Sequence, residues 1–178
     1  MSGRAVFLDR DGVLNASVVR AGKPYPPASA AELEILPGVP AALERLEAAG
    51  FRLLVVTNQP DVGRGTQTRA EVDAIHARMR AELPALDAIY SCFHDDKDHC
   101  ACRKPLPGML LDAAREWDVD LRASYMVGDR WRDTDAGAAA GCKTVFIDRK
   151  YDERQPQAVD ATVTSLADAA AWILGETT

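Results

Sequence analysis

Short apolar runs, each long enough for one strand, recur along the chain and alternate with segments of helical periodicity. The strand-like runs lie at residues 4–9, 51–57, 88–93, 124–128 and 143–147. Helices are predicted at 38–50, 68–83, 107–117 and 136–140, and 161–174 is expected to hold an edge strand and a closing amphipathic helix. Continuous apolar runs of this length are typical of parallel strands buried on both faces. The alternation therefore predicts an α/β fold in which helices cover both faces of a parallel sheet.

Local signals define the ends of two helices and single out two irregular stretches. Thr68 and Glu71 form a capping box, and Gly50 stands where a helix end favours a left-handed residue. The Pro-rich segment 10–37 is too long for an ordinary connection and is expected to be a functional flap, while 58–67 is expected to be a polar loop. Because no internal repeat or shift in composition divides the chain, residues 1–178 are expected to form a single domain.

Composition narrows the class of protein. Hydrophobic residues make up 47% and charged residues 27% of the 178, which is typical of a globular protein. A formal net charge of -6 argues against nucleic acid as a partner, and no apolar run is long enough for a signal peptide or a membrane span. The expectation is a cytoplasmic protein that acts on a small molecule and, because no long amphipathic seam is evident, works as a monomer.

Four of the predicted strands are followed by polar residues that could carry chemistry. These are Asp9 with Asp11, Thr57 with Asn58, Arg103 with Lys104, and Asp129 with Asp133. Since ligands bind at the carboxyl ends of strands in an open parallel sheet, these side chains are expected to converge. Several carboxylates, a hydroxyl and a lysine suit a phosphoryl group held beside a hard divalent cation.

These residues fall into four motifs that follow one another in order along nearly the whole chain. They read Phe-Leu-Asp9-Arg-Asp11-Gly-Val-Leu-Asn15, Val-Val-Thr57-Asn58-Gln59, Arg103-Lys104-Pro105 and Gly128-Asp129-Arg-Trp-Arg-Asp133. On these motifs the chain resembles the haloacid dehalogenase (HAD) superfamily of aspartate-nucleophile phosphatases. The resemblance implies a HAD-like Rossmannoid three-layer sandwich with a central parallel sheet and no separate cap domain.

The chemistry expected of the motifs is hydrolysis in two steps through an aspartyl-phosphate. A carboxylate can attack phosphorus once the repulsion between the two anions is cancelled, and Asp9 is the expected nucleophile. Asp11 is expected to protonate the leaving oxygen and later to deprotonate water, as members of the family do. Lys104 would add a positive charge, and Thr57 would donate a hydrogen bond to a phosphoryl oxygen.

Magnesium is the expected cofactor of this chemistry. The predicted ligands are Asp9, Asp129 and the backbone carbonyl of Asp11. Asp133 follows Asp129 by one helical turn and is expected to support the metal shell or Lys104 rather than to bind the ion.

A second metal site is predicted directly before Arg103. Cys92, His94, Cys100 and Cys102 provide three thiolates and one imidazole, a set that prefers tetrahedral Zn²⁺. Four protein ligands leave no position for water, so this zinc would be structural. His99 could replace His94, and unliganded, reduced cysteines are the alternative.

Two remaining residues with reactive side chains have ordinary interpretations. Cys142 lies in an apolar run and is expected to be a buried core thiol, and His76 is expected to be a surface or half-buried residue of its helix.

The cysteine-rich loop that leads into Arg-Lys-Pro narrows the resemblance to heptose bisphosphate phosphatases and the related histidinol-phosphate phosphatases. The resemblance implies hydrolysis of D-glycero-D-manno-heptose 1,7-bisphosphate to the 1-phosphate, in the synthesis of lipopolysaccharide or related glycan precursors. It gives Arg103 a role in substrate recognition, and Asn58, Arg64 and Arg130 are further candidates for substrate binding. A basic far end of the site would favour a bisphosphate over a protonated amine.

Two questions about specificity and activity stay open. Segment 16–30 does not match the short substrate loop of that family and is expected to help choose the sugar. A phosphatase for histidinol phosphate or another small phosphate, and a catalytically silent HAD-like binding protein, are the alternatives.

Overall fold

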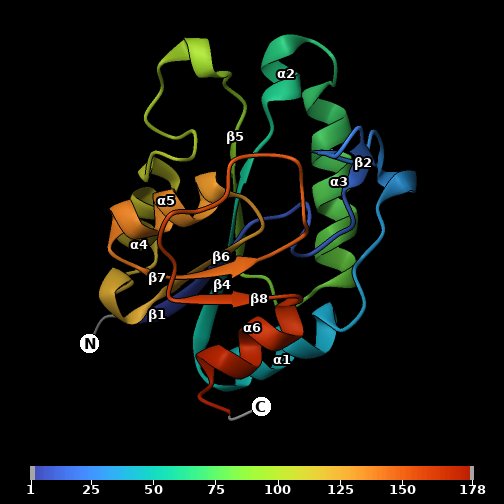
Figure 1. Ribbon diagram of the computed structural model, residues 1–178. Helices are drawn as coiled ribbons and strands as arrows, with labels where there is room; N and C mark the ends of the chain where they lie inside the picture. Colours follow the sequence, from blue (N-terminus) through green and yellow to red (C-terminus); the bar gives the residue numbers. More distant parts are fainter. Residues whose placement is uncertain (1–2, 177–178) are drawn as a thin grey trace.

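The computed structural model describes residues 3–176, and its centre is a parallel sheet of six strands (Figure 1). The strand order is β5-β4-β1-β6-β7-β8, and all five pairings are parallel. The strands are β1 (Arg4–Leu8), β4 (Phe51–Asn58), β5 (Ala88–Cys92), β6 (Tyr125–Gly128), β7 (Lys143–Ile147) and β8 (Ala161–Val163). The five predicted strands and the edge strand are therefore confirmed.

The central strand β1 shows why its sequence is apolar without alternation. Val6 and Leu8 belong to the core on one face of the sheet, whereas Ala5 and Phe7 belong to the core on the other face. All four side chains are fully buried. A strand buried on both sides needs apolar residues at every position, which is the pattern that predicted it.

Helices form the outer two layers. On one side lie α1 (Val39–Ala48), α3 (Arg69–Glu82) and α6 (Leu166–Ile173), and on the other lie α4 (Gly108–Glu116) and α5 (Trp131–Ala140) (Figure 1). This is the predicted three-layer sandwich, and between residues 3 and 176 it carries no separate cap domain. Among these described helices, none has the length and apolar character needed to cross a bilayer.

The predicted helix-end signals are present. Thr68 Oγ1 accepts a hydrogen bond from the Glu71 amide at 3.2 Å, and Glu71 Oε2 accepts from the Thr68 amide at 2.7 Å. Gly50 follows α1 with a φ of 83°, a conformation that costs glycine little. These local rules therefore place the ends of α1 and α3 correctly.

The segment 10–37 is more regular than predicted. It contains an antiparallel hairpin, β2 (Val18–Arg20) with β3 (Lys23–Tyr25), and a 3₁₀ turn at Ala30–Glu32. The turn residues Ala21 and Gly22 both have positive φ, at 49° and 74°. Hairpin turns of this kind usually carry Asn-Gly or Asp-Gly, and proline is uncommon in strands, so Ala21 and Pro24 concealed the hairpin.

Two helices differ from the prediction. The predicted loop 58–67 contains the short helix α2 (Pro60–Arg64), which has Pro60 at its first position and Gly65 after its end, a signal that was present in the sequence. Helix α5 begins at Trp131, five residues before the predicted start at 136. Its first turn is closed by Asp133, whose carboxylate accepts a hydrogen bond from the Arg130 amide at 3.0 Å.

Candidate active site

A cavity of about 560 Å³ lies at the carboxyl ends of the strands. It is lined by every residue predicted for catalysis, magnesium or substrate except Thr57, which is buried. The chain leaves β1 toward β4 on one side of the sheet and later adds β6 on the other, so the cavity stands where the strand order changes direction. Such a switch point is where open α/β sheets bind ligands. The hairpin β2–β3 also lines the cavity, through Lys23 and Tyr25.

Lys104 lies at the bottom of the site and joins two acids. Its Nζ donates to Asp9 Oδ1 at 2.9 Å, to Asp133 Oδ1 at 2.6 Å and to the Val56 carbonyl at 2.8 Å. Burial alone would lower the pKa of Lys104, but Asp133 and Asp9 raise it above its ordinary value. Lys104 is therefore a permanent positive charge beside Asp9.

Asp9 and Asp129 carry more negative charge than Lys104 can balance. Burial, followed by the charge of Asp133, raises the pKa of Asp9 to about 6. Burial and the charge of Asp9 raise the pKa of Asp129 well above its usual range. Oxygens of Asp9, Asp129 and Asp133 lie within 4.8 Å of one another. Buried carboxylates at this spacing are stabilised by a bound cation.

The contacts of Asp129 and Asp133 distinguish which carboxylate can bind that cation. Tyr151 donates its hydroxyl to Asp129 Oδ2 at 2.8 Å, whereas Asp129 Oδ1 is buried and has no hydrogen-bond partner among residues 3–176. Asp133 uses one oxygen for Lys104 and the other for the Arg130 amide. The donor set thus fits a hard cation such as Mg²⁺ on Asp129 Oδ1, with Asp133 in a supporting position.

Tyr151, which lies outside the motifs, and Gly12 of the first motif shape the position of Asp129. Tyr151 lies on the segment between β7 and β8, and no short-range pattern connects it with Asp129. Gly12 has a φ of 83°, and a Cβ atom there would lie 1.8 Å from Asp129 Oδ2. Only glycine lets the turn after Asp11 and the Asp129 carboxylate approach so closely.

Asp11 is held as a carboxylate in this structure. Its oxygens accept hydrogen bonds from Arg10 at 3.0 Å, from Asn15 at 2.9 Å and from Gln59 at 2.9 Å. Burial would raise the pKa of Asp11, but the Arg10 charge and the hydrogen bonds from Asn15 and Gln59 lower it below its ordinary value. The acid role predicted for Asp11 would therefore require it to leave Arg10 before it carries a proton.

The side chain of Arg10 is fully buried and contacts His76 on its other side. Arg10 Nη1 lies 3.0 Å from His76 Nε2. Because a guanidinium can only donate, Nε2 must accept, and the His76 ring is neutral. Burial and the charge of Arg10 lower the pKa of His76 to about 4. His76 is half-buried, as predicted. It also helps to hold the guanidinium of Arg10, which restrains Asp11.

The contact between Arg10 and His76 predicts that His76 contributes less to stability in mild acid. The ordinary pKa of histidine is 6.5, so between pH 6.5 and 4 the unfolded chain binds a proton that the folded His76 does not. The contribution of His76 to the free energy of unfolding should therefore fall as the pH drops through this range, by up to about 1.4 kcal/mol per pH unit. The raised pKa values of Asp9 and Asp129 act in the opposite direction, equally in every variant that keeps these acids. Urea unfolding between pH 4.5 and 7.5 measures the slope.

The matched variant is His76→Gln, whose amide oxygen can still accept from Arg10 but does not titrate. The slope of its free energy of unfolding against pH should be smaller than that of the wild type by up to about 1.4 kcal/mol per pH unit, the equivalent of one bound proton. His99→Gln, which removes an exposed imidazole, is the control. Identical slopes for His76→Gln and the wild type would contradict the neutral, buried state of His76.

Thr57 and Asn58 end β4 and take different positions. Gln59 Nε2 donates to Thr57 Oγ1 at 2.9 Å, which leaves the hydroxyl proton of Thr57 free to be donated. Asn58 exchanges two hydrogen bonds with the Lys104 backbone, at 3.0 and 3.1 Å. Asn58, which was predicted to bind substrate, also lines the cavity. Both polar atoms of its side-chain amide bond the Lys104 backbone, so they hold Lys104 in position.

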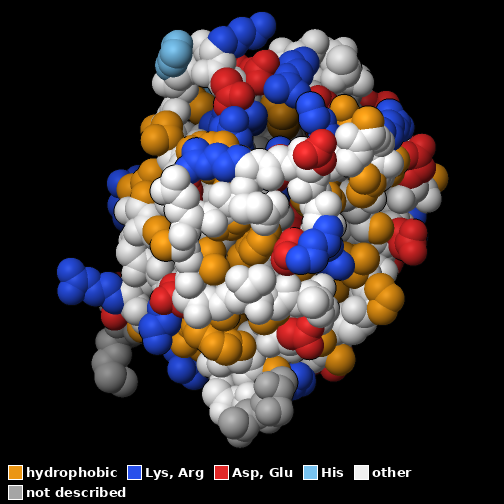
Figure 2. Space-filling view, viewed as in Figure 1, with side chains coloured by type: hydrophobic (Ala, Val, Ile, Leu, Met, Phe, Trp, Pro, Cys, Tyr) orange, Lys and Arg blue, Asp and Glu red, His pale blue; other side chains and the backbone are white. Residues whose placement is uncertain are grey.

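The three arginines predicted to bind substrate all line the cavity, and each bonds a carboxylate of the protein. Arg64 bonds Asp95 at 2.7 Å, Arg103 bonds Asp96 at 2.8 Å, and Arg130 bonds Glu153 at 2.6 Å. Arg132 also lines the cavity and was missed, although its place in the fourth motif could have marked it. Acidic and basic side chains accordingly gather side by side where Figure 1 shows α2 and the loop after β5 (Figure 2).

The loop after β5 brings the four predicted zinc ligands together. Sγ of Cys92, Cys100 and Cys102 and Nδ1 of His94 lie within 4.8 Å of one another. Cys92 and Cys100 are 3.7 Å apart, and His94 Nδ1 is 3.3 Å from Cys102. His94 is the histidine of this cluster, and His99 follows a 3₁₀ turn at Asp96–Asp98 with a φ of 49°. Three thiols and one imidazole in this arrangement fit a tetrahedral ion such as Zn²⁺.

The remaining cysteine is a core residue. Cys142 is 7% exposed and packs with the cluster under α4 and α5, as predicted. Burial raises the pKa of its thiol to about 12, so the thiol is protonated and inert at neutral pH.

Comparison with known proteins finds similarity to one family of hydrolases. A family model for haloacid dehalogenase-like hydrolases matches residues 16–141, which include the second, third and fourth motifs. The chain is 43% identical over 143 residues to D-glycero-beta-D-manno-heptose-1,7-bisphosphate 7-phosphatase of Bordetella bronchiseptica, covering 78% of this chain and 77% of that protein. It is 38% identical over 178 residues to the protein of that name from Escherichia coli K12, covering 92% and 90%.

A solved structure is similar over nearly the whole chain. It is D,D-heptose 1,7-bisphosphate phosphatase from B. bronchiseptica complexed with magnesium and phosphate. The TM-score is 0.84 at 37% sequence identity, and the match covers 98% of this chain and 99% of the other.

Proposed function

This chain belongs to the haloacid dehalogenase-like hydrolase family, and we propose that it is a Mg²⁺-dependent phosphatase that hydrolyses D-glycero-D-manno-heptose 1,7-bisphosphate to the 1-phosphate. The observation that carries the proposal is the buried set at the carboxyl edge of the sheet. There Lys104 joins Asp9 to Asp133, and Asp129 keeps one buried oxygen without a partner among residues 3–176. Such a set is built for a phosphoryl group beside a cation.

In the first step, a carboxylate oxygen of Asp9 attacks phosphorus. A bond forms between Asp9 and phosphorus, the bond from phosphorus to the sugar oxygen breaks, and Asp11 gives its proton to that oxygen. Lys104 balances charge beside Asp9, and Thr57 donates to a phosphoryl oxygen. Bound Mg²⁺, held by Asp9, Asp129 and the Asp11 carbonyl, would offset the charge of the phosphoryl group.

In the second step, water attacks the phosphorus of the aspartyl-phosphate. Asp11, now a carboxylate, takes a proton from that water, and the bond between Asp9 and phosphorus breaks to release inorganic phosphate. Both steps need Asp11 to turn away from Arg10, so the contacts of Arg10, Asn15 and Gln59 describe the resting position of Asp11.

We extend the proposal to the rest of the protein. The two cores lie on the two faces of one sheet, which supports a single domain over residues 1–178. The four cysteines are free thiols, which supports a reducing compartment, the cytoplasm, and a structural Zn²⁺ on Cys92, His94, Cys100 and Cys102. We propose that the protein acts as a monomer on a phosphorylated sugar.

The test is phosphate release, with Mg²⁺ present, from heptose 1,7-bisphosphate, fructose 1,6-bisphosphate and histidinol phosphate. A preference of about 100-fold in kcat/KM for the heptose, equivalent to about 2.7 kcal/mol in the transition state, is expected. A preference for histidinol phosphate would overturn the sugar but keep the phosphatase. No release from any of the three would favour a catalytically silent member of the family.

A further inference from the structure

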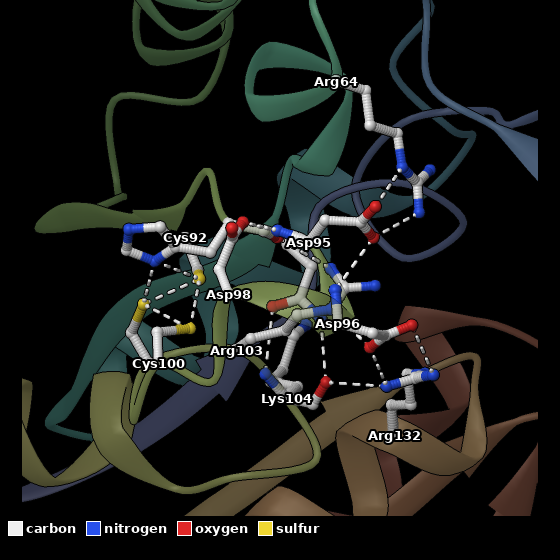
Figure 3. Close-up of polar contacts among 12 residues, drawn as sticks. Arg64, Cys92, Asp95, Asp96, Asp98, Cys100, Arg103, Lys104 and Arg132 are labelled. Atoms are coloured by element: carbon white, nitrogen blue, oxygen red, sulfur yellow. Dashed lines mark hydrogen bonds and ion pairs between the residues drawn. The ribbon is translucent and has the colours of Figure 1, made fainter.

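The loop that holds the cysteine cluster also places an acid between two arginines of the cavity. Arg103 Nε donates to Asp96 Oδ1 at 2.8 Å. Arg132 donates to the same oxygen at 3.1 Å and to Asp96 Oδ2 at 3.4 Å. Figure 3 shows these two guanidinium groups approaching Asp96 from different elements, Arg103 from the third motif and Arg132 from the first turn of α5.

The arginines are held in place by more than Asp96. Arg103 also donates to the His94 carbonyl at 3.3 Å, and Arg132 donates to the Lys104 carbonyl at 3.4 Å and lies 4.8 Å from the Trp131 ring. The side chains of Arg103 and Arg132 are 11% and 25% exposed, whereas that of Asp96 is 59% exposed. Asp96 is thus the partner that can move into water while the two guanidinium groups stay.

Two guanidinium groups that meet one carboxylate make a site for a larger anion. A phosphate offers more charge and more acceptor oxygens than a carboxylate, so it forms stronger charge-assisted hydrogen bonds with the same donors. Arg103 precedes Lys104 and Arg132 precedes Asp133, and all four line the same cavity as Asp9. A substrate with one phosphoryl group at Asp9 can therefore present a second anion to this pair.

We propose that Asp96 occupies, in the free protein, the position of the substrate's second phosphate, and that Arg132 joins Arg103 in binding this phosphate once Asp96 has been displaced. The inference rests on the proposed function and deepens it. It makes Asp96 an internal competitor of the second phosphate, because a substrate with a single phosphate has no group that replaces Asp96 on the two arginines and binds without displacing it. It adds Arg132 to the substrate-binding residues.

The experiment compares heptose 1,7-bisphosphate with heptose 7-phosphate, which lacks the second phosphate. Asp96→Asn should lower KM for the bisphosphate by about 2- to 5-fold, the effect of removing one partly exposed competitor. Arg132→Ala should raise it at least about 10-fold, since charge-assisted hydrogen bonds to the phosphate are lost. Neither variant should change KM for heptose 7-phosphate.

The matched control is Asp112→Asn, a carboxylate of the same 59% exposure that pairs with Arg115 on α4, away from the cavity. Arg132→Lys keeps the charge without the planar fork and should give an intermediate KM. If Asp96→Asn raises KM for the bisphosphate as Arg132→Ala does, Asp96 only positions the arginines and the proposal is wrong. Equal effects of Arg132→Ala on both substrates would also overturn it.

The outcome for the wild type separates this inference from the proposed function. Equal kcat/KM for heptose 7-phosphate and the bisphosphate would leave a phosphatase without a site for a second phosphate, and only the inference would fail. A wild type that releases no phosphate from either substrate would remove the proposed function together with the inference.

Discussion

Asp9→Asn should reduce phosphate release by at least about 1,000-fold, because an amide cannot form the aspartyl-phosphate through which hydrolysis is split into two steps. The loss should appear in kcat, since the attacking oxygen itself is removed. Steady-state phosphate release from the best substrate of the panel, with saturating Mg²⁺, measures the effect.

The variant is expected to keep its fold. Lys104 retains Asp133 and the Val56 carbonyl as partners, and the amide oxygen of the new Asn can still accept from Nζ. Asp9 is also a buried carboxylate whose pKa is raised by burial and by Asp133, so removing its charge relieves repulsion in the metal-free protein. The melting temperature should therefore fall little, and any loss of activity can be assigned to chemistry.

Asp160→Asn is the matched control. Asp160 accepts a hydrogen bond from the Thr144 amide at 2.7 Å, near the start of β7 and so at the opposite end of the strands from the cavity. It should retain nearly full activity. Turnover of Asp9→Asn within about tenfold of the wild type would require a nucleophile other than Asp9 and would overturn the two-step mechanism.

Several parts of this site that the sequence predicts follow a strand directly or end one. Asp9 comes after β1, Asn58 ends β4, and Asp129 comes after β6, so the rule that parallel strands end at one edge brings them together without any knowledge of distances. The capping box at Thr68 and Glu71 is likewise local. Both depend on spacing along the chain, which a sequence displays.

The parts that were missed depend on contacts between distant segments. Tyr151 reaches Asp129 from the segment after β7, and His76 reaches Arg10 from a helix 66 residues along the chain. Asp96 meets Arg132 across 36 residues. No periodicity or motif encodes these pairs, because each follows from how the helices and loops pack on the finished sheet. The ion pairs of the arginines in the cavity also show that a basic residue predicted to bind substrate can instead bind a carboxylate of the same protein.

The cysteine-rich loop leads to the second large expected effect, the loss of the ion from that cluster. The protein should bind one Zn²⁺ per chain, and Cys100→Ser should lose it, because three ligands no longer complete a tetrahedral site. We expect the melting temperature to fall by roughly 5–15 °C, which corresponds to a loss of about 2–4 kcal/mol in a chain of this size. Elemental analysis and thermal unfolding measure the two quantities.

Cys100→Ser should affect the chemistry at Asp9 less than it affects binding of the second phosphate. Lys104 is tied to Asn58, Asp9 and Asp133 outside the loop, so the chemistry at Asp9 should survive in part. Arg103 is held by Asp96 and by the His94 carbonyl, both within the loop, so binding of a second phosphate should suffer more. KM for heptose 1,7-bisphosphate should therefore rise more than KM for heptose 7-phosphate.

Cys142→Ser separates zinc binding from simple destabilisation. It also removes a thiol from the protein, but this thiol is buried under α4 and α5 and lies outside the metal cluster. The variant should lose stability and still bind one Zn²⁺ with the two KM values unchanged. If Cys100→Ser and Cys142→Ser have the same zinc content and the same KM values, the cluster does not hold an ion. The conformation of the loop must then come from its hydrogen bonds, such as that from the Asp95 amide to Asp98 at 2.7 Å. If they differ as expected, the ion fixes Asp96 and Arg103 relative to each other, and a metal outside the cavity contributes to the choice of substrate within it.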